Sequence, residues 1–325
     1  MLLSFIAPGI TITVSTSVST PTGHTAVTQQ KRKTSKLAWR DALWGYLFIL
    51  PQMLGFLFFV VGPLIAVMVF STQDRNLLFG TATPIGLDNF RVLLTEDKLF
   101  WQVMWNTFYF SLLLVPLNIV IALALSLVLA RQFRGAHLFR LVYFAPVVTA
   151  AAAWAIVWRF ILQGENGTLN QFLRLIGIDG PNWLHDPFWA MQAVIVTRVL
   201  KNVGLNIVIL LGAILNIPAQ YDEAARVDGA NGWQVLWNIK LPLLAPALLF
   251  VSVITLIGSL KVFDHIMLMT AGGPGNSTMV LVYYIYYQAF QFFQTGYASA
   301  LAVILFVITL ALTVVQWVLR KEEIQ

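Results

Sequence analysis

The chain has 325 residues, of which 58% are hydrophobic and only 10% are charged. A soluble domain carries about 25% charged residues, so a water-soluble globule is excluded and lipid is the expected solvent. The net charge of +6 is scattered between apolar runs without a basic stripe for nucleic acid, and the absence of cysteine excludes disulfides, thiolate metal sites and cysteine nucleophiles.

The N-terminal segment precedes the first long apolar run. Met1–Val14 is apolar, but it lacks the basic n-region of a signal peptide and is too short to span a bilayer. Ser15–Thr28 is rich in Ser and Thr. We therefore predict that residues 1–40 form a disordered cytoplasmic tail. The alternative is a start codon assigned upstream of the true one.

The remainder, residues 41–325, contains apolar runs long enough to cross a bilayer core of about 30 Å as helices. Lipid cannot satisfy the backbone of an open strand, so each run is predicted to be helical, and prolines inside the runs are tolerated as kinks. The predicted spans are Leu43–Phe70, Thr107–Leu129, Leu141–Leu162, Phe188–Leu215, Leu243–Met269 and Ala298–Leu319. The predicted fold class is an all-α membrane protein with six transmembrane helices.

Lys and Arg in the connections predict the orientation of these spans. With the N-terminus inside, twelve of them lie in the inner segments and five in the outer ones. This bias predicts that both termini are cytoplasmic, and an even number of spans agrees with it.

Polar and aromatic side chains in spans three to five predict a water-filled path. Arg198, Asn202 and Asn206 recur at four-residue spacing on one helix face, with Lys201 beside them. Ionisable groups inside a membrane are costly and need a reason, and a polyhydroxylated solute needs polar groups and flat aromatic faces. The predicted path residues are Trp158, Arg198, Lys201, Asn202, Asn206, Lys261 and Asp264.

A structural alternative stays open for several of these side chains. Asn202 and Asn206 can instead form hydrogen bonds between helices. Lys261 and Asp264, three residues apart on one predicted helix face, can form an internal ion pair. Arg198 can extend towards the interface along its aliphatic stem.

The connection between spans four and five, residues 216–242, is rich in charge for this chain. Pro218 suits a helix start, and Asp222 near the first turn suits the positive end of the helix dipole. Gly229 is followed by Asn231-Gly232, a turn signal, before a second short helical stretch, Trp233–Ile239. We predict a helix–turn–helix elbow that projects into the cytoplasm and docks on a soluble partner.

The segment after span five, residues 270–297, carries no charge. Within it, Met279–Phe293 is apolar and rich in Tyr, but it is short for a span, and a seventh span would place the C-terminal basic residues outside. An outer interfacial or re-entrant helix is therefore the prediction here.

The elbow resembles a known family. The elbow matches every spaced position of the EAA signature of binding-protein-dependent ABC importer permeases. The matching sequence is Glu223-Ala224-Ala225, three residues, Gly229, nine residues, Ile239, one residue and Leu241-Pro242. Weaker cues are Pro51, Gly86–Phe90 and Leu268–Pro274. Together they look like the carbohydrate branch, of the maltose and glycerol-3-phosphate type.

This resemblance implies the type I importer fold and a role for each part. The EAA loop would be a coupling helix that seats on a separate ATPase, and its implied coupling residues are Glu223, Ala224, Ala225, Gly229, Ile239, Leu241 and Pro242. The implied partners are a second homologous permease, two ATP-binding cassette subunits and an extracytoplasmic solute-binding protein, at the bacterial inner membrane.

The chain itself lacks a motor and a catalytic site. No Lys follows a Gly, so there is no phosphate-cradling loop, and ATP and Mg²⁺ are expected on the partner ATPase. Four separated His predict no metal centre, and no enzyme activity is expected. The predicted function is import of a sugar.

Three alternatives remain. Import of glycerol-3-phosphate or a related anion is one, because Arg198 and Lys201 can offset a negative charge. An ATP-independent secondary transporter is another, for which Asp264 is the acidic candidate clearly inside a span. A membrane-embedded enzyme would need clustered His or carboxylates near one interface.

Overall fold

The computed structural model describes residues 36–131 and 135–322, in two units that divide between Leu57 and Phe58. The first unit contains α1 (Lys36–Phe56). Residues 1–35 of the predicted tail lie outside the described residues. The helix begins at Lys36, so the prediction of disorder is wrong for residues 36–40, where good helix formers extend the apolar run.

The second unit is mostly helical. Its helices are α2 (Gly62–Phe70), α3 (Asp88–Thr95), α4 (Lys98–Leu129), α5 (Ala136–Val148), α6 (Ala151–Ile161), α7 (Thr168–Leu175), α8 (Pro187–Leu215), α9 (Ala219–Val227), α10 (Gly232–Val235), α11 (Leu241–Leu260), α12 (Leu281–Tyr286) and α13 (Thr295–Glu322). Short π-helical segments occur at η1 (Leu57–Val61), η2 (Leu236–Lys240), η3 (Ile266–Thr270) and η4 (Tyr287–Gln291). A hairpin pairs β1 (Gln73–Asn76) with β2 (Thr81–Pro84), Gln73 opposite Pro84.

The long apolar helices confirm the membrane class. Within the described residues, five helical stretches are long and apolar enough to cross a bilayer, or six when a bent pair counts as one span. The stretches are Ala42–Phe70, Lys98–Leu129, Pro187–Leu215, Gly232–Leu260 and Thr295–Gln316, and the bent pair is Leu141–Val148 with Ala151–Ile161.

Three of the predicted spans differ clearly from the structure. The second begins at Lys98 rather than Thr107. The third is not one continuous helix, because α5 and α6 diverge by 111°. The fifth ends at Leu260 rather than Met269, since Lys261 already leaves the helical conformation. Predicted span boundaries follow hydropathy, whereas helix ends depend on backbone partners elsewhere in the fold.

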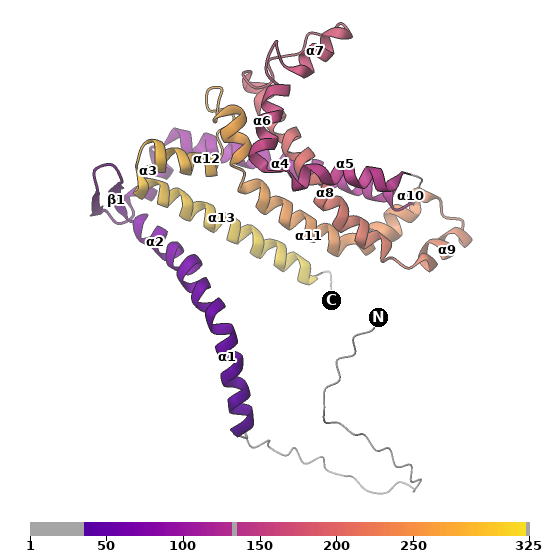
Figure 1. Cartoon of the computed structure of the whole chain (residues 1–325), viewed down its shortest axis with the longest axis horizontal. Coiled ribbons are helices and arrows are strands. Elements are labelled where there is room, and N and C mark those ends of the chain that lie inside the picture. The colour runs from indigo at the N-terminus through magenta and orange to yellow at the C-terminus, as the bar shows by residue number, and fades with distance from the viewer. Residues whose placement is uncertain (1–35, 132–134, 323–325) are drawn as a thin grey trace. The chain divides into compact units, whose positions relative to one another are not determined.

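Helix α8 is the centre of the second unit. In Figure 1 α4, α8 and α11 run side by side, and contacts join α8 to α4, α5 and α11. In the most apolar 18-residue stretch of α8, 61% of the residues are buried, against 28% in the corresponding stretch of α4. Gly204 permits the close approach of α5, because a Cβ there would lie 2.2 Å from the Tyr143 carbonyl oxygen.

The two ends of this bundle carry different elements. Helices α9 and α10 lie at one end, and β1, α3 and α12 lie at the other (Figure 1). The segment predicted to be an interfacial or re-entrant helix forms α12 and η4, and its Leu281, Tyr283 and Tyr284 are buried in the core. It is not among the stretches long enough to span a membrane in the described part of the chain.

Asp97 links three helices at the α12 end. Its Oδ1 accepts hydrogen bonds from the backbone N–H groups of Leu99 and Phe100 and so caps α4. Its Oδ2 accepts from the hydroxyls of Tyr284 (2.7 Å) and Tyr297 (2.6 Å). Burial raises the pKa of the Tyr284 phenol and the hydrogen bond to Asp97 raises it further, so this hydroxyl remains a donor at neutral pH.

Candidate functional site

The elbow between α8 and α11 folds as two short helices around a tight turn. Helix α9 begins directly after Pro218, and Asp222 lies in its first turn, near the positive end of the helix dipole. Gly229 adopts φ +78°, a left-handed conformation that a residue with a side chain rarely takes. Asn231 and Gln234 then form a reciprocal capping box that starts α10, which continues through η2 into α11.

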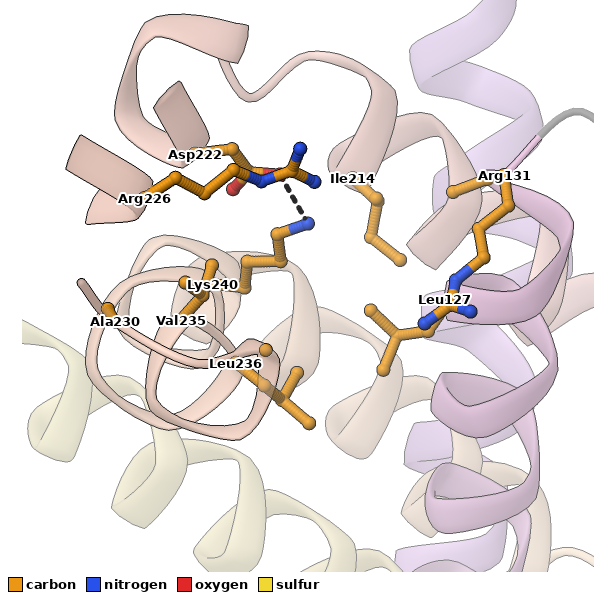
Figure 2. A pocket seen from close by; sticks show the side chains of 11 residues that line it. Leu127, Arg131, Ile214, Asp222, Arg226, Ala230, Val235, Leu236 and Lys240 are labelled. Atoms are coloured by element: carbon orange, nitrogen blue, oxygen red, sulfur yellow. Dashed lines mark ion pairs between the residues drawn. The ribbon is translucent and has the colours of Figure 1, made fainter. Parts of the chain in front are cut away.

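An ion pair closes this elbow. Lys240 Nζ lies 2.8 Å from Asp222 Oδ2, which joins η2 to the first turn of α9 across the intervening turn (Figure 2). Both side chains are half-buried, at 24% and 32% exposure. The pair therefore holds η2 against the first turn of α9.

A cavity of about 680 Å³ lies beside this ion pair. Its lining comes from the ends of α4 and α8 and from the elbow. The side chains that line it are Leu127, Ala130, Arg131, Ile214, Asp222, Arg226, Ala230, Gly232, Val235, Leu236 and Lys240. Figure 2 shows Arg226 beside Asp222 and Lys240, with Arg131 on the opposite wall. Three cations and one carboxylate make the wall of this cavity basic.

The outer surface of the elbow is exposed. Of the predicted coupling residues, Glu223, Ala224, Gly229 and Pro242 are exposed, Ile239 and Leu241 are half-buried, and Ala225 is buried. Sequence reasoning missed the apolar part of this surface. Val227 is 88% exposed, and Trp233 and Trp237 form an exposed edge-to-face pair. The sequence signal that could have revealed this surface is the presence of Val227, Trp233 and Trp237 within a charged segment.

The predicted path residues on α8 fall into two groups. Asn206 is buried, and its Nδ2 donates to Asn118 Oδ1 on α4 (2.6 Å) and to Thr255 Oγ1 on α11 (2.9 Å). Both of its N–H donors are therefore used, which favours hydrogen bonding between helices over solute contact. Asn202 is half-buried and has no hydrogen bond within the described residues, so it keeps free donors.

Lys201 and Arg198 have different surroundings. Lys201 is 6% exposed and donates to backbone carbonyl oxygens of Pro146, Val147 and Thr149. Arg198 lies close enough to Asp264 for electrostatic attraction, although its Nε is buried without a hydrogen-bond partner.

Lys261 and Asp264 do not share a helix face, which corrects the prediction. Helix α11 ends at Leu260, and the chain is irregular at Val262 and Phe263 before it becomes helical again at Asp264 and continues into η3. Among the described residues no ion pair joins Lys261 to Asp264, and both are exposed. The break in the helix separates them, and Asp264 attracts Arg198 electrostatically without an ion pair between the two in the described part of the chain.

Trp158 lies in an aromatic cluster. Its ring packs against Trp154, at 5.8 Å between centroids, and it lines a small apolar pocket with Trp183 and Trp189. Trp154 Nε1 donates to the Thr197 carbonyl oxygen (3.0 Å), which fastens α6 to α8. The structure thus links Trp158 to α8 through packing rather than through the polar residues of the predicted path.

In the described part of the chain, no group of three or more His, Asp or Glu side chains lies close enough together to hold a metal ion.

Comparisons with known proteins find clear relatives. Residues 118–322 match the family model described as "Binding-protein-dependent transport system inner membrane component". The probable ABC transporter permease protein YesP of Bacillus subtilis is 35% identical, with 90% of this chain and 94% of the relative covered. The lactose transport system permease protein LacF of Rhizobium radiobacter is 32% identical (86% and 94% covered), and the trehalose/maltose permease MalF of Thermococcus litoralis is 32% identical (87% and 95% covered).

A solved structure shares the fold. A chain from the crystal structure of a bacterial ABC transporter involved in the import of the acidic polysaccharide alginate superposes with a TM-score of 0.78. It is 24% identical, and the match covers 88% of this chain and 99% of that one.

Proposed function

Because this chain belongs to the binding-protein-dependent transport system inner membrane components, we propose that it forms half of a sugar-translocation path and receives motion from a separate ATPase through its elbow. It is a multi-pass permease subunit of an ABC importer in the inner membrane. Its family consists of transport components, not enzymes.

The exposed elbow is the observation that carries this proposal. Glu223, Val227 and Trp233 present acidic and apolar groups on a segment whose two helices are joined by the Asp222–Lys240 ion pair. A projection with exposed apolar side chains suits docking on a soluble protein. Two ATP-binding cassette subunits would bind ATP and Mg²⁺ and close, and the elbow would pass that closure to α8 and α11.

A second, homologous permease would complete the path, and an extracytoplasmic binding protein would deliver the solute. The twelve Lys and Arg of the inner segments, against five in the outer ones, support cytoplasmic termini. The hairpin β1–β2 and α12, at the opposite end of the bundle, would then face the binding protein.

A neutral sugar is the proposed solute. The names of relatives specify lactose, trehalose/maltose and arabinooligosaccharides. The N–H donors of Lys201 are used by carbonyl oxygens, and Arg198 lies beside Asp264. Lys201 is therefore not free for an anionic solute, and these relatives' names specify sugars, so glycerol-3-phosphate is disfavoured.

Cross-linking tests the docking surface. The chain has no cysteine, so Val227→Cys introduces a single thiol at an 88% exposed position of the elbow. In the assembled transporter we expect this thiol to cross-link to an ATP-binding subunit and to be protected from an impermeant thiol reagent added outside. Phe79→Cys, 75% exposed in the hairpin, is the matched control and should behave in the opposite way. Labelling of Val227→Cys from outside would refute the proposal.

A further inference from the structure

We propose that Lys201 is a positioning residue that caps the broken third span and so shapes the translocation path without contacting the solute. The inference rests on the proposed function only in taking α5, α6 and α8 to border that path. The geometry of the cap stands independently of the solute.

The break between α5 and α6 leaves backbone carbonyl groups without helical partners. Thr149 and Ala150 are extended, with ψ of 142° and 136°, and the two helix axes diverge by 111°. The last carbonyl groups of any helix lack partners within it. Hydrocarbon supplies none, so a break at membrane depth persists only where protein groups satisfy them.

Lys201 supplies those partners. Its Nζ donates to the carbonyl oxygens of Val147 (3.2 Å) and Thr149 (2.6 Å), and to that of Pro146, which also accepts from the Thr149 N–H (3.2 Å). All three lie at the C-terminal end of α5. An ammonium has three N–H donors and no acceptor, so three carbonyl oxygens use all of them. Its positive charge also lies at the negative end of the α5 dipole, where a cation is stabilised.

Helix α8 fastens both halves of the broken span, one on each side of Lys201. Towards the C-terminus, Gly204 lets α5 approach at Tyr143. Towards the N-terminus, the Thr197 carbonyl oxygen accepts a hydrogen bond from Trp154 on α6. Lys201 therefore lies at the level of the break, where it holds the end of α5 while α6 turns away.

Distance measurement across the break tests this role. Val142→Cys on α5 and Phe160→Cys on α6 are exposed label positions, at 66% and 64%, in a chain without other thiols. Spin–spin distances would be measured in the assembled transporter without ATP or solute, in parallel with uptake. The test variants are Lys201→Met and Lys201→Arg, and the control is Lys98→Met, an exposed lysine in the first turn of α4.

In the doubly labelled protein that retains Lys201, and in its Lys201→Arg and Lys98→Met variants, we expect one narrow distribution of the distance between the two labels. Lys201→Met should broaden it and shift its mean, and should lower the maximal uptake rate with little change in the apparent KM. A second outcome also supports the role of Lys201 as a cap: the Lys201→Met variant fails to assemble, whereas Lys201→Arg assembles with normal distances. The guanidinium of Arg would then restore the missing N–H donors.

Three results overturn the proposal. An unchanged distribution in Lys201→Met means that the break does not need the ammonium. A raised KM with unchanged distances in that variant makes Lys201 a solute ligand. Loss of assembly in both variants makes the position one of tight packing. The label distances are measured without solute, so they do not depend on transport. If only sugar transport failed, the proposed function would be refuted, but the proposal that Lys201 caps α5 would stand.

Discussion

Two amides on α8, one turn apart, illustrate how neighbouring residues acquire different roles. Asn206 is buried between Asn118 and Thr255, with both N–H donors used. Asn202 is half-buried without a hydrogen bond within the described residues. The four-residue spacing that the sequence offers is the same for both, and only the neighbouring helices distinguish them.

Substitution of each amide by Leu should separate these roles. Asn206→Leu removes two interhelical hydrogen bonds and should lower stability by about 1–2 kcal/mol, with an unchanged apparent KM for uptake. Asn202→Leu should abolish uptake while stability and assembly with the ATP-binding subunit are preserved. Thermal unfolding in detergent and uptake by proteoliposomes measure the two effects, and normal uptake by Asn202→Leu would remove that residue from the path.

The Asp222–Lys240 ion pair is the second residue-scale feature. The sequence presents both charges in the elbow, but nothing in their spacing pairs them. Partly exposed ion pairs contribute about 0.2–1 kcal/mol, so the pair matters more for holding η2 against α9 than for unfolding.

Breaking this pair should uncouple the transporter without unfolding it. We expect Lys240→Met to lower ATP-driven uptake, to leave solute affinity unchanged and to leave the melting temperature nearly unchanged. The charge exchange Asp222→Lys with Lys240→Asp should restore part of the uptake because attraction is regained. If the charge-exchange variant showed no more ATP-driven uptake than Lys240→Met, the ion pair would have no role in coupling.

At the scale of elements, close packing of α5 against α8 depends on one glycine. Gly204 meets the Tyr143 carbonyl oxygen, whereas Gly212, farther along α8, has open space where its Cβ would lie. The same helix thus contains a glycine that packing requires and one that it does not.

Alanine at each glycine should therefore have opposite effects. Gly204→Ala forces the backbones apart and should cost about 1–3 kcal/mol, as overpacking does. Gly212→Ala should be neutral or should stabilise by up to about 1 kcal/mol, because alanine favours helix. Thermal unfolding of the two variants measures the difference, and equal melting temperatures would show that α5 is not held at Gly204.

At the scale of the whole molecule, the chain has polar groups along α8 and an exposed elbow but no phosphate-binding loop of its own. A secondary transporter would instead need a coupling carboxylate in the membrane. Asp264, the candidate for that role, is exposed beyond the end of α11.

Uptake should consequently stop when the ATP-binding subunits are omitted from reconstitution. Vesicles that contain the permease pair, the binding protein and an ion gradient should accumulate no labelled sugar, and addition of the ATP-binding subunits with Mg-ATP should restore accumulation. Uptake driven by the gradient alone would contradict assignment as an ATP-driven subunit.

Local pattern in the sequence was enough to predict the membrane class, the number of apolar runs and the elbow with its glycine turn. Hydropathy and turn chemistry act over a few neighbouring residues, so they can be read along the chain. The 111° break in the third span, the end of α11 at Leu260 and the partners of Lys201, Asn206 and Asp222 were decided by tertiary structure. Each depends on groups far apart in sequence that meet only when the helices pack, because a buried donor or an unpaired carbonyl takes whichever partner the neighbouring helix presents.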